Sequence, residues 1–137
     1  MFSKNILILM TSLASLNKIN HINDLKWINR VLVMVNHEKS DLSKNIDSIK
    51  NEFNERDFVI VHIIEQNSYI YKRKMSKRFT KSVVSKIKNI DDNNYIFLIG
   101  KDGQVKNSYP LDIELETIFN DVDKMPMRKY EKQIRKN

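Results

Sequence analysis

Two apolar runs of strand length, separated by one helical pattern, constrain the fold of this chain more than any other feature. The runs span residues 30–35 and 58–64. The apolar residues at helical spacing between them are Leu42, Ile46, Ile49 and Phe53. Unbroken apolar runs are typical of strands that are covered on both faces. The sequence therefore predicts a β-α-β unit with two parallel strands and a right-handed crossover.

Three further patterns extend this unit. Apolar residues at helical spacing over 79–90 predict a second helix, and the apolar run at 95–99 predicts a third strand. Residues 101–103 predict a tight hairpin turn, because Gly103 accepts the positive φ that such turns need. The chain then returns as an edge strand at 104–108.

A last helix closes the domain. Pro110 and Asp112 open it, apolar residues at helical spacing run from Leu115 to Met125, and Pro126 is expected to end it. The segment between the second strand and the second helix is interpreted as a polar loop. The predicted fold is α/β, in the order β-α-β-α-β-β-α, with a four-stranded mixed sheet and helices on both faces.

The amino terminus has the layout of a secretory signal. Lys4 supplies a positive charge, residues 6–13 are apolar, and small residues precede a cleavage site after Ala14. The apolar run is too short to span a bilayer, which takes about 20 residues. We expect a signal peptide at 1–14 and export to the periplasm or beyond. The alternative is a first core strand or helix of a cytoplasmic protein.

The absence of cysteine from all 137 residues excludes disulfides and thiol chemistry within this chain. Thiol-disulfide oxidoreductase and thiol peroxidase activities are excluded with it. We expect no cofactor, and the three scattered histidines have no metal-ligand spacing.

His37 is the best single candidate for proton transfer. It follows the first strand, where open α/β sheets usually bind ligands, and Glu65 follows the second strand. Together they could form an acid/base pair, although no nucleophile or third partner is fixed by spacing. We favour the interpretation that both are solvated loop residues. His62, inside an apolar run, is expected to be a hydrogen-bonded core or edge histidine.

The formal charge of +7 is concentrated in two segments. Residues 70–90 contain eight lysines and arginines and no acid, and residues 124–136 contain six against the single acid Glu131. Such segments can bind anionic polymers or lipids. Because no exposed aromatic residues or nucleic-acid motif accompany them, we favour solvated faces and consider nucleic acid an improbable partner.

Four short motifs occur within this order of elements. They are Trp27-x-x-Arg30, Glu55-Arg56-Asp57, Gly100-Lys101-Asp102-Gly103 with Lys106, and Met125-Pro126-Met127-Arg128. Together they resemble a bacterial family with a thioredoxin-like fold that is known only as a domain of unknown function. A related peroxiredoxin-like module occurs in animal secreted proteins of the sushi-repeat-containing and coiled-coil-domain-containing kinds. The resemblance covers residues 24–128 and leaves 129–137 as a basic tail.

The resemblance implies no established activity. The chain departs from it in its lysine-rich segment 71–94, and it lacks the proline before the third strand that redox-active thioredoxins place beside their site. We therefore expect a non-catalytic binding or interaction module for an unknown protein or small ligand, acting through the surface near His37 or through residues 125–128. The alternatives are an enzyme of non-thiol chemistry and a basic module that binds anionic polymer or lipid.

Two of the motifs also allow a structural interpretation. Trp27 is expected to cap the sheet edge or the core, and Arg30 to pair with a nearby acid. Met125 is expected to complete the last helix, and Arg128 to tie the tail back onto the domain. A docking surface at this end is the competing interpretation, because Met and Arg are common at interfaces.

Overall fold

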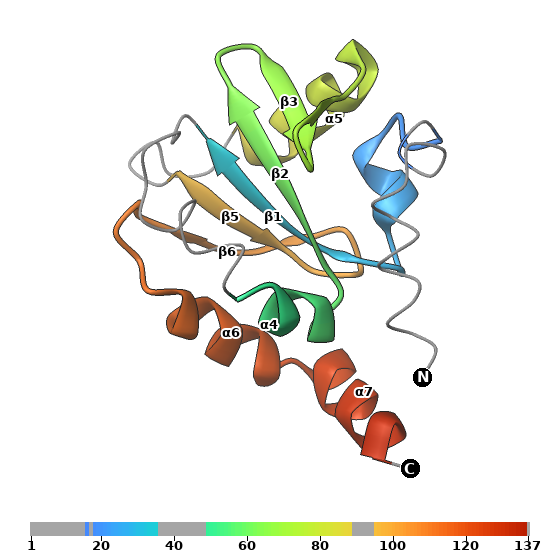
Figure 1. Ribbon diagram of the computed structural model, residues 1–137, viewed down its shortest axis with the longest axis vertical. Helices are drawn as coiled ribbons and strands as arrows, with labels where there is room; N and C mark the ends of the chain where they lie inside the picture. Colours follow the sequence, from blue (N-terminus) through green and yellow to red (C-terminus); the bar gives the residue numbers. More distant parts are fainter. Residues whose placement is uncertain (1–15, 17, 36–48, 89–94, 137) are drawn as a thin grey trace.

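The computed structural model describes residues 16, 18–35, 49–88 and 95–136. Its centre is a mixed sheet in the order β4-β3-β2-β1-β5-β6 (Figure 1). Strands β1 and β2 are parallel, and every other neighbouring pair is antiparallel. The strands are β1 (Arg30–Val35), β2 (Phe58–Ile64), β3 (Asn67–Ile70), β4 (Arg73–Lys74), β5 (Ile96–Ile99) and β6 (Val105–Tyr109).

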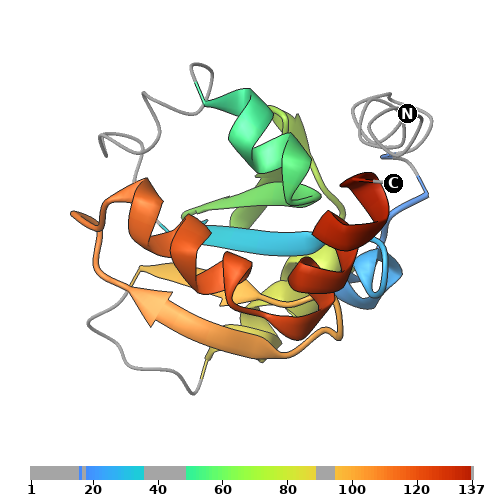
Figure 2. The same ribbon diagram turned by 90° about the horizontal axis from the view of Figure 1, so that it is seen from below.

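Helices cover both faces of this sheet, as predicted (Figure 2). The short 3-10 helix η1 (Ile22–Leu25) and α5 (Lys77–Ile87) pack on one face. Helices α4 (Lys50–Glu55) and α6 (Leu115–Asp123) pack on the other.

The position of β1 in the middle of the sheet explains why its apolar run is continuous. Val31 and Val33 enter the core on the η1 and α5 side, while Leu32 and Met34 enter the core on the α4 and α6 side. All four side chains are at most 2% exposed. A strand in the middle of a sheet that is covered on both faces has no solvent side, so polar alternation is absent.

The strand count differs from the expected four, because β3 and β4 form a hairpin in the segment interpreted as a loop. Ser68 and Ile70 are buried and their neighbours are half-exposed, which is the alternation of a strand. The hairpin turns through Tyr71 and Lys72, with φ of 49° and 68°. Two-residue turns of this hand usually contain Asn-Gly or a similar pair, so the Tyr-Lys sequence gave no turn signal.

The carboxyl end also differs from expectation. Helix α6 ends at Asp123, and Pro126 begins a further helix, α7 (Pro126–Lys136). Proline suits a first helical position, because the amide hydrogen that it lacks would have no partner there. The segment expected as a basic tail is therefore helical through residue 136. In Figure 1, α7 lies at the end of the sheet where β1 and β2 begin.

Candidate functional site

Charged side chains from all four sequence motifs converge at this end of the sheet, beneath α7. They form one connected set of ion pairs, which we call the ionic cluster. Its five cations match five acids. Its members are Arg30, Glu52, Glu55, Arg56, Asp57, Lys101, Asp123, Arg128, Glu131 and Arg135.

Glu131 of α7 is the centre of the ionic cluster. Arg30, at the start of β1, donates two parallel hydrogen bonds to its carboxylate, at 3.0 and 3.1 Å. The Lys101 ammonium lies 2.7 Å from Glu131 Oε2, and Arg128 Nη1 lies 3.7 Å from Oε1. One carboxylate on the last helix is thus shared by three cations from the strand start, the hairpin turn and the helix itself.

Arg128 fastens α7 to α4 and α6. Its guanidinium donates to the carbonyl oxygen of Glu55 at 3.0 Å, to the Glu55 carboxylate, and to Asp123 at 3.2 Å. Asp123 also accepts two hydrogen bonds from Arg56, at 2.9 and 3.1 Å. Arg56 lies over the ring of Phe119, 4.5 Å from its centroid, so the ionic cluster borders the apolar core directly.

Asp57 joins the hairpin turn to the same helix. Its carboxylate accepts from Lys101 at 2.8 Å and from Arg135 at 2.9 Å. Its carbonyl oxygen accepts from the backbone amide of Arg30 at 3.0 Å and from the side-chain amide of Asn29 at 3.0 Å. The entries to β1 and β2 are therefore connected to each other as well as to α7.

Four of the five cations of this cluster are deeply buried. Arg30 and Arg128 are each 1% exposed, and Lys101 is 8% exposed. A buried charge costs several kcal/mol unless it is paired and hydrogen-bonded, so each of these cations requires its carboxylates. The bidentate Arg30–Glu131 pair, with two parallel hydrogen bonds, is among the strongest and most geometrically specific ways to bind a carboxylate.

The carboxylates of Glu131 and Asp123 respond to the same cations. Burial by itself would raise the pKa of Glu131, but hydrogen bonds from Arg30 and Lys101, with their positive charges, outweigh it and hold the pKa below the ordinary value. For Asp123, Arg56 and Arg128 outweigh burial in the same way and lower the pKa. Both groups therefore favour the folded state most when they are ionised.

The free energy of unfolding should consequently fall on acidification. A carboxylate with a lowered pKa in the folded state stabilises that state above its unfolded pKa, and this contribution is lost as the pH falls towards the folded-state value. We expect stability to decline once the pH drops below about 4.5, the ordinary Glu value. Urea unfolding at a series of pH values measures this decline. A Glu131→Gln variant should decline less steeply, and equal slopes would contradict the account.

Every charged group of the ionic cluster is paired with an opposite charge. Lys101 is held by two carboxylates, so its ammonium is not poised as a nucleophile. In the described part of the chain, no group of three or more His, Asp or Glu side chains could hold a metal ion. The buried atoms without a partner there are Arg30 Nε and Asn29 Oδ1. The arrangement holds helices and strands together.

The β5–β6 hairpin turn has the predicted form. Gly103 adopts φ 84°, and the Gly103 amide donates to the Gly100 carbonyl at 2.9 Å. Asp102 pairs with Lys106 at 2.7 Å on the surface of the same turn. A Cβ at Gly100 would meet Lys106 Cε at 2.7 Å, so the flexible end of that lysine would have to shift. Lys101 is the member of this motif that enters the ionic cluster.

Glu65, one half of the proposed acid/base pair, does not belong to this site. Glu65 is an exposed residue with φ 57° in the turn between β2 and β3, at the opposite end of β2 from the ionic cluster. His37 lies outside the described residues, so its distance from Glu65 stays untested. Arg30 and Arg128 do converge on Glu131, and Glu65 is not with them. His62 is half-buried in β2.

Trp27 is not a core or edge cap, contrary to expectation. Its side chain is 61% exposed, and the Lys26 ammonium lies 5.4 Å from the ring centroid. Its backbone takes φ 70° in the link between η1 and β1, and its amide donates to the Lys101 carbonyl at 2.6 Å. The backbone of Trp27 is therefore fixed by the hairpin turn while its ring faces solvent.

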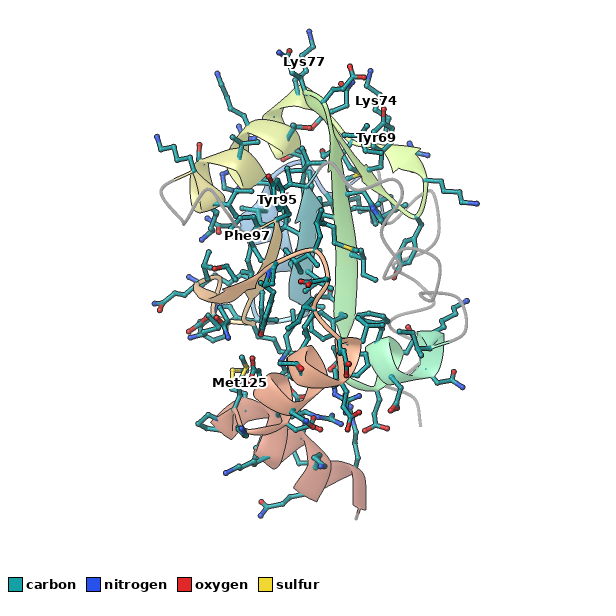
Figure 3. The ribbon with its side chains drawn as sticks, turned by 90° about the vertical axis from the view of Figure 1, so that its left-hand side faces the viewer. Tyr69, Lys74, Lys77, Tyr95, Phe97 and Met125 are labelled. Carbon is teal, nitrogen blue, oxygen red and sulfur yellow. The ribbon has the colours of Figure 1, made fainter. Side chains whose placement is uncertain are left out.

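The basic segment 70–90 forms a separate surface on β4 and α5. Its exposed cations have no ion pair with an acid in the described ranges; they include Lys72, Lys74, Lys77, Arg78 and Lys81. Figure 3 shows Lys74 and Lys77 at the end of the molecule away from Met125. This surface and the ionic cluster are thus independent features.

The sequence interpretation included Glu55 and Asp57 as motif residues but did not identify all the acids of the ionic cluster. It expected Arg30 to find an acid and Arg128 to tie the tail back, and both expectations are confirmed. It did not choose Glu131 or Asp123 as the partners. Glu131 had one available signal, which is that it is the single acid in an otherwise basic segment.

These features define a class: a cysteine-free α/β domain with a mixed six-stranded sheet, whose motif residues build a buried ionic cluster. The chain belongs to the family described as Domain of unknown function (DUF4174), whose model matches residues 21–131. That range contains every member of the ionic cluster except Arg135. No curated protein and no solved structure is significantly similar to the chain.

Proposed function

We propose that this domain is a non-catalytic interaction module whose contact surface is the outward side of α7. The observation that carries the proposal is the orientation of that helix. Arg128, Glu131 and Arg135 share the inward face and are held in the ionic cluster. A helix on a protein surface usually turns its apolar residues inward, and α7 does the reverse.

Apolar side chains consequently project from α7 into solvent. Met127, Tyr130 and Ile134 are 40%, 64% and 53% exposed, and their spacing of three and four residues places them on one stripe. We call these three residues the outer stripe. Because α7 packs on the domain through charged residues, its apolar residues stay in water. A partner that covered the outer stripe would gain the hydrophobic free energy of burying this area.

We further propose that the domain is related to the thioredoxin-like fold and that it is exported. The strand order β2-β1-β5-β6, with β1 and β2 parallel and β5 and β6 antiparallel, supports a relationship to the thioredoxin-like fold, with β3 and β4 as an added hairpin. The signal-like sequence at 1–14 lies outside the described residues, and export to the periplasm is proposed from its sequence alone. No helix in the described ranges could span a membrane.

A variant of the outer stripe tests the proposal. Tyr130→Ser with Ile134→Ser should change the free energy of unfolding by no more than about 0.5 kcal/mol per substitution, because both side chains are exposed. Urea unfolding measures this change. When each protein is immobilised and exposed to cell-envelope extract, the variant should fail to retain a component that the unaltered protein retains. Val84→Ser on α5, which removes another exposed apolar side chain, is the matched control. Equal retention by all three proteins would contradict the proposed contact surface.

A further inference from the structure

We infer that the partner of the outer stripe is the surface of an anionic lipid bilayer, along which α7 lies lengthwise; the inference rests on the contact surface proposed above. The size of the stripe is the first argument. Three side chains along about two helical turns are far fewer than the 20 to 30 residues per partner in a typical stable protein interface. A short stripe of Met, Tyr and Ile is, however, sufficient for shallow insertion at a membrane interface.

Charge provides the second argument. The inward arginines of α7 are neutralised in the ionic cluster, whereas Lys124, Lys129 and Lys132 are exposed and have no ion pair within the described ranges. Because a helix with its side chains is only about 10 to 12 Å wide, and the Debye length is about 10 Å at 0.1 M salt, lysines on its other side still feel the charge of the headgroups. An apolar stripe with lysines on the opposite, polar face is typical of helices that lie in a membrane interface, and this positive charge is complementary to anionic lipid.

The same charge argues against a second copy of this chain as the occupant. Two chains of formal charge +7 repel each other as they approach. Like charges at close range oppose such a contact, whereas an anionic bilayer attracts each lysine near its surface. Among these occupants, charge complementarity favours the bilayer.

The third argument is that the ionic cluster fixes the orientation of α7 on the domain. Arg30 and Lys101 hold Glu131, and Arg128 is held by Glu55 and Asp123, so the axis of α7 is fixed against the end of the sheet. Isolated helices of this length are marginal in water. Since α7 is already ordered by the domain, it does not have to fold on the membrane, and its stripe is presented without that entropic cost.

The experiment uses the cysteine-free background of the full 137-residue chain. An environment-sensitive dye is attached at Ile134→Cys, and in a second protein at Lys74→Cys on the distant basic surface. Each is titrated with vesicles of phosphatidylcholine alone and of phosphatidylcholine mixed equally with phosphatidylglycerol. We expect a blue shift of the dye at position 134 with anionic vesicles, a much smaller shift with neutral ones, and no shift at position 74.

Unlabelled variants measure the energetics by vesicle co-sedimentation. Tyr130→Ser with Ile134→Ser should weaken binding at least about tenfold, and Lys129→Gln with Lys132→Gln about tenfold at low salt. Lys74→Gln with Lys77→Gln, matched in charge, should change it less than about twofold. An unchanged dye spectrum at 134, or loss of binding only in the Lys74 and Lys77 variant, would overturn the inference. If vesicle binding failed while the stripe still retained a protein partner, the inference would be wrong and the proposed function would stand.

Discussion

Replacing Glu131 by glutamine should lower the free energy of unfolding by about 3 kcal/mol. The substitution keeps the shape of the side chain and removes the charge that Arg30, Lys101 and Arg128 share. Arg30 and Arg128 are almost wholly buried, so their charges cannot be compensated by water. Breaking a buried ion pair by removing one partner typically costs about 3 to 5 kcal/mol, because the other charge stays buried. Urea unfolding followed by circular dichroism measures the loss.

Lys132→Gln is the matched control, since it removes one exposed charge from the same helix. Its effect should stay within about 0.5 kcal/mol. A Glu131→Gln variant as stable as the Lys132→Gln variant would mean that the ionic cluster does not hold α7.

Arg128→Met should be equally damaging, at about 3 to 5 kcal/mol. Methionine has a similar length but cannot donate to Asp123 or to the carbonyl and carboxylate oxygens of Glu55. The helix would lose its attachment to α4 and α6, and its own apolar residues could not replace it because they face outward. We expect faster proteolytic cleavage within α7 together with the lower urea midpoint.

Arg128→Lys distinguishes the geometry of the guanidinium from its charge. An ammonium is a compact point charge and cannot reproduce the planar fork that reaches several acceptors at once. The lysine variant should therefore recover less than half of the lost stability. Full recovery would show that charge alone is needed at position 128.

The central strands were predictable because their surroundings are simple. The ranges expected for β1 and β2 agree with the structure, since a strand buried on both faces has a continuous apolar run that no helix of that length would share. The β5–β6 hairpin was predictable for a local reason, which is that Gly103 supplies the positive φ of the turn.

The β3–β4 hairpin and α7 were not predictable in this way. The hairpin turns through Tyr71 and Lys72, neither of which is a usual residue for positive φ. Helix α7 packs on the domain through Arg128, Glu131 and Arg135. Its apolar residues are not the packed ones, so its sequence pattern suggests a solvated tail. Both elements depend on contacts with the rest of the domain, and sequence patterns record such contacts poorly.

The candidate site was foreseen in part. The motif residues Arg30, Lys101 and Arg128 were identified, but their convergence depends on how β1, β5 and α7 meet in space. Spacing along the chain cannot supply that information, because Arg30 and Glu131 are 101 residues apart. Buried arginines are uncommon, and an arginine at the start of an apolar strand is a reasonable signal that an acid is nearby.

Amide hydrogen exchange in α7 tests the central claim most directly. If the ionic cluster holds this helix on the domain, the amides of residues 130–135 should exchange about a hundredfold or more slowly than in an unstructured peptide. They should lose that protection in Glu131→Gln and keep it in Lys132→Gln. Exchange at unprotected rates in the unaltered protein would contradict the account, because it would show that the ionic cluster does not hold α7 on the domain.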